Sequence, residues 1–173
     1  MNVLVIIGSK HGATQEIGAA IAKQLNTAGH HATAIDAENP AGELDLYDAF
    51  VIGSAIYMGH WTKDSRRFIE DNQNVLAAKP LWLFSSGPLG DVTGPGKPDK
   101  QMEEFTALLN PAGHAIFGGA LDKSDLNIVE RATMRAVHAT YGDYRPWAEI
   151  SQWTDEIIKA LGPIDPKNVL PAP

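Results

Sequence analysis

Short apolar runs alternate along this chain with longer stretches in which apolar residues recur every three or four positions. Four runs, each beside a glycine or serine cluster, span Val3–Ile7, Ala49–Ile52, Leu81–Phe84 and Ala115–Phe117. Continuous apolar runs of this length are typical of strands covered on both faces, as in a parallel sheet. The more polar stretch His31–Ile35 is expected to form a strand at the edge of that sheet.

Between these runs, apolar residues show the spacing of amphipathic helices. Ile17, Ile21 and Leu25 are four residues apart and precede Gly29, which predicts a helix with one buried stripe that ends before the glycine. Further helices are expected around Phe68 and Ile69, over Met102–Leu109, from about Asp125 to His138, and from Pro146 to Leu161.

The alternation of strands and helices predicts one doubly wound α/β domain over residues 1–162. Each pair of parallel strands needs a crossover, and right-handed crossovers place helices on both faces of the sheet. Ligands of such sheets bind at the carboxyl ends of the strands, so function should lie in the loops that follow them. The proline-rich stretch 163–173 is expected to be a tail without a function of its own.

Composition excludes several classes of protein. The chain has 173 residues, of which 44% are hydrophobic and 20% charged, the balance of a globular protein rather than a disordered one. Its net charge of −7 argues against nucleic-acid binding, and the absence of cysteine excludes disulfides, iron–sulfur clusters and thiolate nucleophiles. No apolar run approaches the roughly 20 residues that cross a bilayer. The N-terminus carries no basic region of a signal peptide, so a cytoplasmic protein is expected.

The loop after the first predicted strand has the composition of an anion-binding site. It leads directly into a helix, where backbone N–H groups and the helix dipole favour negative charge. Small residues allow the backbone to fold around a phosphate, while hydroxyls and basic side chains can add donors. The alternative is an ordinary strand-to-helix turn. The candidate phosphate ligands are Ser9, Lys10, His11, Gly12, Ala13 and Thr14.

Other nucleotide-binding and metal-binding motifs fit less well. The Rossmann pattern requires three glycines, whereas this loop has two glycines four residues apart. The stretch Gly94–Pro98 departs from a Walker loop, because proline replaces the Ser or Thr that would hold magnesium. A phosphoacceptor receiver would need acidic residues where this chain has Gly8-Ser9 and Gly53-Ser54. The histidines lack the helical pairing of a metal site, so no metal is assigned.

The loop after the third predicted strand combines aromatic residues with glycines. It should lie at the same sheet edge as the first loop, where flat side chains suit a planar aromatic ligand. The alternative is that Tyr57 and Trp61 only cover the end of the sheet. His60 is a candidate proton donor, because histidine titrates near neutral pH, or else a structural residue. The candidate cofactor contacts here are Ala55, Ile56, Tyr57, Met58, Gly59 and Trp61.

A third glycine-rich loop follows the fourth predicted strand and continues to Lys100. Loops of this length are usually functional or disordered, and this one could close over a planar ring or a substrate. Its candidate cofactor contacts are Ser86, Gly87, Pro88, Leu89 and Gly90.

Together these loops resemble those of the flavodoxin-like superfamily. Residues 9–14 match that superfamily's FMN phosphate loop, and residues 53–61 and 85–90 stand at the positions that hold the isoalloxazine ring. The resemblance implies a three-layer sandwich with a five-stranded parallel sheet of order 2-1-3-4-5 and non-covalently bound FMN. More narrowly, residues 53–61, 117–122 and 142–145 are similar to the flavodoxin-type, menaquinone-dependent protoporphyrinogen dehydrogenases. That group passes electrons from porphyrinogen to quinone.

Three functions are compatible with this resemblance. An FMN oxidoreductase would exchange electrons with a small molecule such as a quinone or a porphyrinogen. A flavodoxin-type electron carrier would instead serve a redox protein, and the acidic net charge would steer its encounter with that partner. The third is a fold that has lost FMN and acts through protein contacts. The sequence leaves the oligomeric state open, a homodimer included.

Overall fold

The computed structural model of this chain describes residues 1–39, 42–57, 59–87, 100–122 and 141–162. Its central sheet has five long parallel strands in the order β2-β1-β3-β5-β6, and the two-residue strand β4 pairs antiparallel with β3. The order of the long strands is the 2-1-3-4-5 that the resemblance implies, and the α/β fold class is confirmed. The strands are β1 (Asn2–Gly8), β2 (His31–Asp36), β3 (Ala49–Tyr57), β4 (His60–Trp61), β5 (Leu81–Ser86) and β6 (Gly113–Phe117).

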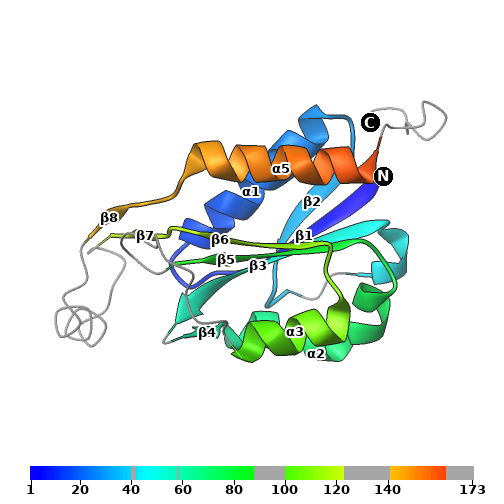
Figure 1. Cartoon of the computed structure of the whole chain (residues 1–173), viewed down its shortest axis with the longest axis horizontal. Coiled ribbons are helices and arrows are strands. Elements are labelled where there is room, and N and C mark those ends of the chain that lie inside the picture. The colour runs from blue at the N-terminus through cyan, green and yellow to red at the C-terminus, as the bar shows by residue number, and fades with distance from the viewer. Residues whose placement is uncertain (40–41, 58, 88–99, 123–140, 163–173) are drawn as a thin grey trace.

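Helices cover both faces of this sheet (Figure 1). One face carries α1 (Ala13–Thr27) and α5 (Trp147–Leu161), and the other carries α2 (Lys63–Ala77) and α3 (Lys100–Leu109). A short 3₁₀ helix, η1 (Leu44–Leu46), precedes β3. The helix expected at about 125–138 and the tail expected at 163–173 lie outside the described residues.

The alternation of side chains along the strands creates a hydrophobic core on each face. Leu4 and Ile6 of β1 pack with residues of α2 and α3, whereas Val3, Val5 and Ile7 pack with residues of α1 and α5. All five side chains are at most 2% exposed, which accounts for the continuous apolar run of this central strand. Strand β2 contains no fully buried residue, as its more polar sequence predicts for an edge.

A second, smaller sheet follows β6. It consists of β7 (Ala120–Leu121) and β8 (Gly142–Asp143), which pair antiparallel. Figure 1 shows this pair beyond the carboxyl ends of the long strands, at the edge where the loop between β1 and α1 also lies. The fold therefore brings the loops singled out in the sequence to one end of the molecule, and it adds β7 and β8 to that end.

Candidate functional site

The turn from β1 into α1 forms one side of the candidate site. Gly12 is the N-cap of α1 and has φ of +85°, a left-handed conformation that glycine adopts without strain. Its N–H donates to Ser9 Oγ at 3.0 Å, and its carbonyl accepts from the Glu16 N–H at 3.0 Å. A Cβ built on Gly12 would meet no atom within 4 Å. The loop thus turns tightly into the helix and leaves open space beside Gly12.

The other candidate phosphate ligands differ in exposure. Lys10 is exposed, His11 and Ala13 are half-buried, and Thr14 is only 2% exposed. Because α1 begins at Ala13, the N–H groups of its first turn have no partner within the helix and are directed toward this end. An open glycine turn at the start of a helix suits a phosphate group, which gains backbone donors and the favourable end of the helix dipole.

Buried hydroxyls join the end of β3 to the start of α2. Ser54 has no exposed surface, and its Oγ accepts the Thr62 N–H at 2.9 Å. Thr62 is the N-cap of α2 and accepts the Ser65 N–H at 3.4 Å. A Cβ on Gly8 would come within 1.9 Å of Ser65 Oγ, so this glycine allows β1 to approach α2 closely. Sequence analysis missed Ser54 and Thr62; a threonine directly before a helical stretch was the available signal.

Strands β3 and β4 pair as an antiparallel hairpin at the same end. Tyr57 pairs with His60 across the turn, and Gly59 takes φ of +82°. Ala55 and Ile56 are half-buried at the end of β3, and Ile56 packs against the core on the side of α2. His60 is exposed and therefore accessible to a ligand.

Trp61 belongs to the hydrophobic core, although it also lines the cavity described below, next to His60. It is 1% exposed and packs edge-to-face on Phe105, with ring centroids 5.4 Å apart. Its indole N–H donates to Ser85 Oγ at 2.8 Å, and its backbone N–H donates to Gln101 Oε1 at 2.9 Å. An enclosed indole presents no free face to a planar ligand. The structure therefore does not support the stacking role expected of Trp61 and instead shows a packing role.

Only the start of the third loop lies within the described residues. Ser86 is 4% exposed, and Gly87 has φ of +93° and donates its N–H to the Phe117 carbonyl at 3.0 Å. A Cβ on Gly119 would come 3.3 Å from the Gly87 backbone, so the segments after β5 and β6 pack backbone against backbone. Four candidate contacts fall outside the described residues, namely Met58, Pro88, Leu89 and Gly90.

A cavity of about 900 Å³ brings the first two loops together. Ser9, Lys10 and Gly12 line it from the first loop, and His60 lines it from the hairpin. The lining also includes Thr62 at the start of α2. A volume of this size falls in the range of small-molecule sites, roughly 300–1,000 Å³. The cavity therefore gathers the phosphate-loop candidates and the candidate proton donor around one space.

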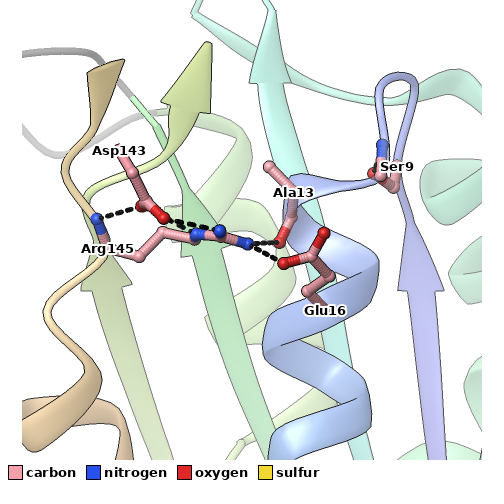
Figure 2. Close-up of polar contacts among 6 residues, drawn as sticks. Ser9, Ala13, Glu16, Asp143 and Arg145 are labelled. Carbon is pink, nitrogen blue, oxygen red and sulfur yellow. Dashed lines mark hydrogen bonds and ion pairs between the residues drawn. The ribbon is translucent and has the colours of Figure 1, made fainter. Parts of the chain in front are cut away.

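A buried arginine ties β8 to the first turn of α1 (Figure 2). The side chain of Arg145 is 10% exposed; its Nη2 donates to Asp143 Oδ2 at 2.6 Å and its Nη1 to Glu16 Oε2 at 2.7 Å. Its Nε also donates to Asp143 Oδ1 at 2.8 Å, and its Nη1 reaches the Ala13 carbonyl at 3.4 Å. The hydrogen bond from Arg145 lowers the pKa of Asp143, and the same bond raises the pKa of Arg145. Both groups are therefore charged at neutral pH.

A second cavity, of about 640 Å³, lies beside this arginine. His11 lines it from the loop before α1, and Ala13 from the start of that helix. Leu121 of β7 and Tyr141, before β8, line it from the side of the small sheet. Sequence analysis assigned none of the residues from 117 to 145 to the site, although their likeness to one flavoprotein group was a signal. Residues of the phosphate loop thus face one cavity on each side.

The sequence of this chain matches one known family over most of its length. Residues 4–145 match the flavodoxin domain. The chain belongs to the flavodoxin family. Flavodoxin domains are FMN-binding flavoproteins that transfer electrons, so the expected cofactor is confirmed at the level of the family. Among curated proteins, none matches the sequence.

Solved flavodoxins share the fold of this flavodoxin-family chain. A flavodoxin from the domain Archaea has 15% identity and a TM-score of 0.59, with 93% of this chain and 99% of that chain covered. Oxidised flavodoxin 1 from Bacillus cereus has 16% identity and a TM-score of 0.57, with 92% and 98% covered. Rubredoxin oxygen:oxidoreductase from Desulfovibrio gigas has 12% identity and a TM-score of 0.61, with 92% of this chain and 36% of that chain covered. At these identities the likeness concerns the fold alone.

The described part of the chain lacks two further kinds of feature. None of its helices combines the length and apolar character needed to cross a membrane. In the same residues, no group of three or more His, Asp or Glu side chains is arranged to hold a metal ion.

Proposed function

We propose that this protein binds FMN with the phosphate at residues 9–14 and the ring against the hairpin of β3 and β4 and the loop that begins at Ser86. The observation that carries the proposal is the open, left-handed turn at Gly12, directly before the first turn of α1. Bound FMN supplies the redox chemistry, and the protein supplies binding, orientation and electrostatics. Tyr57, Gly59 and Gly87 are the proposed neighbours of the ring.

The groups around Gly12 suit a phosphate in chemistry as well as in shape. Ser9 Oγ accepts the Gly12 N–H, and a hydroxyl that accepts one hydrogen bond can still donate its own hydrogen. Lys10 places a positive charge on the wall of the cavity. Hydrogen bonds to a charged acceptor are about twice as strong as those between neutral groups, so the phosphate should contribute much of the affinity.

The proposal is tested by titrating flavin-stripped protein with FMN and, in parallel, with riboflavin, which lacks the phosphate. Quenching of flavin fluorescence reports binding. We expect FMN to bind at least about 100-fold more tightly than riboflavin, the worth of one or two charge-assisted hydrogen bonds. Equal affinities would overturn the assignment of residues 9–14 to the phosphate, and absence of binding would leave a fold that acts through protein contacts.

Gly12→Asp should weaken FMN binding by about 100-fold, because it places a carboxylate in the open space beside the turn. Gly12→Asn is the matched control, since Asn and Asp have the same shape and tolerate the left-handed region comparably. Gly162→Asp is a second control at a positive φ of +78°, also with no atom within 4 Å of the added Cβ. A similar loss in the Asn variant would show that shape, and not charge, is responsible.

We further propose that the electron partner is a small organic molecule, a quinone or a porphyrinogen. Two segments that resemble the protoporphyrinogen dehydrogenases, 117–122 and 142–145, come together: β7 pairs with β8, and the Tyr144 N–H donates to the Gly119 carbonyl at 3.0 Å. They line the 640 Å³ cavity beside the phosphate loop, which offers room for such a molecule. His60, exposed on the wall of the other cavity, is the proposed proton donor.

The second candidate function is electron transfer to a redox protein, favoured by the net charge of −7. Reaction with a small-molecule electron partner distinguishes these two candidate functions. Reduction of a quinone to a quinol takes two electrons and two protons, the amount that one reduced flavin supplies, so we expect reduced, FMN-loaded protein to convert one equivalent of a soluble menaquinone analogue to the quinol in a single turnover. Gly12→Asp serves as the control with little bound FMN. If the protein neither reduces a quinone nor oxidises a porphyrinogen, and a redox protein rapidly oxidises its reduced form, the function is that of an electron carrier.

A further inference from the structure

A cluster of one guanidinium and two carboxylates lies beside the start of α1, and the proposed function gives it no role. Arg145 is nine-tenths buried and donates to Glu16, Asp143 and the Ala13 carbonyl (Figure 2). Its guanidinium carbon also lies 4.7 Å from the centroid of the Trp147 ring. Burial of a guanidinium is costly unless its N–H groups are paired, so this arrangement holds the surrounding segments in place.

The position of Glu16 makes the charge of this cluster relevant to the binding of a phosphate. Glu16 lies in the first turn of α1, two residues after Thr14, and its side chain is 67% exposed. A carboxylate in a first turn stabilises the helix but repels a phosphate bound at the same helix end. With Asp143, the cluster contains two carboxylates and one guanidinium, a formal charge of −1. Without Arg145 that charge would become −2 beside the phosphate loop.

The same segment also contacts the loop after β5. The Tyr144 N–H donates to the Gly119 carbonyl, and the Gly87 N–H donates to the Phe117 carbonyl, each at 3.0 Å. A Cβ on Gly118 would come 2.1 Å from the Tyr144 carbonyl oxygen, so this junction has no room for a side chain at position 118. Arg145 follows Tyr144 directly, and it therefore stands between the proposed ring loop and the proposed phosphate loop.

We infer that Arg145 is a positioning residue of the FMN site, which fixes the first turn of α1 against β8 and offsets the charge of Glu16 so that the phosphate can bind. The inference rests on the proposed function, because it concerns the same phosphate loop. On this inference, Arg145 affects the binding of FMN through its phosphate and does not affect the binding of riboflavin. A purely structural ion pair would affect all flavins alike.

The test compares FMN with riboflavin in Arg145→Met, which keeps an unbranched apolar side chain and removes the charge. We expect the affinity for FMN to fall about tenfold and the affinity for riboflavin to stay unchanged, since the electrostatic effect acts on the phosphate. The loss should shrink at high salt, which screens the added negative charge. Arg67→Met is the matched control: it makes the same change in net charge at the exposed Arg67–Asp71 pair of α2, on the other face of the sheet.

Glu16→Gln gives an independent arm that does not depend on the folding of the arginine variant. It removes the repelling charge from an exposed side chain, so FMN should bind about two- to fivefold more tightly while riboflavin is unaffected. In the double variant, Glu16→Gln should restore most of the FMN affinity lost with Arg145→Met. Weaker FMN binding in Glu16→Gln, or failure to restore it, would overturn the inference.

The results also separate this inference from the proposed function. The inference alone is overturned if the unmodified protein prefers FMN over riboflavin but Arg145→Met lowers the affinities for both flavins equally. It is also overturned if Arg145→Met lowers neither affinity. If the unmodified protein shows no preference for FMN, the phosphate site is overturned and the inference falls with it. Loss of the preference in Arg145→Met, with its recovery in the double variant, supports both.

Discussion

Ser85 is a buried hydroxyl with two side-chain partners from other strands. Its Oγ accepts the indole N–H of Trp61 at 2.8 Å and lies 3.1 Å from His114 Nε2. An indole nitrogen can only donate, so Ser85 must accept from it, while the serine hydroxyl or the histidine ring donates in the second contact. One buried serine thus satisfies a tryptophan from β4 and a histidine from β6.

Ser85→Ala should lower the free energy of unfolding by about 1–3 kcal/mol, because the buried indole N–H of Trp61 would lose its acceptor. Urea unfolding measures this loss. The double variant Ser85→Ala with Trp61→Phe should lose less than the sum of the two single variants, since it removes the donor together with the acceptor. Strict additivity of the two losses would show that this hydrogen bond contributes little.

The sequence could not distinguish a ring-stacking Trp61 from a core Trp61. An aromatic residue after a strand suits either place, and the choice depends on the two-residue strand β4, whose pairing with β3 turns the indole into the core. By contrast, Gly12 was predictable, because the spacing of small residues between a strand and a helix carries its own signal. Local patterns reveal local geometry, but not which face a short strand presents.

At the scale of elements, the long strands and helices were predictable from periodicity, and their ends were not. Strand β3 continues to Tyr57, although the apolar run ends at Ile52. The strand continues beyond the apolar run because Ser54 still pairs with Gly8 of β1 on one side and with Ser85 of β5 on the other. Backbone pairing needs no apolar side chain, so the hydrophobic pattern stops before the strand does.

The short elements at the site left no periodic signal. Strands β4, β7 and β8 each have two residues, too few for a hydrophobic alternation to be recognised in the sequence. The contact between Arg145 and Glu16 joins positions 129 apart, which no local pattern relates. The resemblance pointed to residues 142–145, and the structure shows that Arg145 contacts the start of α1.

For the molecule as a whole, two histidines make stability depend on pH. Burial lowers the pKa of His114, and burial also lowers the pKa of His30, which is 3% exposed, with a smaller effect of the N-terminal amino group. The unfolded chain binds protons at the ordinary histidine value of 6.5, whereas the folded chain binds them only at lower pH. Stability is therefore present above pH 6.5 and is lost as pH falls through the range below it.

This dependence is checked by urea unfolding between about pH 7.5 and 5.5, the range in which histidines titrate. We expect the free energy of unfolding to decrease toward the acidic end, and His114→Gln to flatten the decrease, because glutamine does not titrate. His60→Gln, at an exposed position, is the matched control. A slope that His114→Gln leaves unchanged would contradict the assignment to His114.

The contacts between α1 and the last part of the described chain can form only after that part has been synthesised. Glu16 meets Arg145 across 129 positions, and Gln24 of α1 donates to Asp155 of α5 across 131. Contacts between such remote positions form late and slow the folding of a domain. While the ribosome has released only the first strands, the phosphate loop exists without the arginine that offsets Glu16. A prematurely terminated product that ends before Arg145 would also lack α5, and therefore both of these contacts with α1.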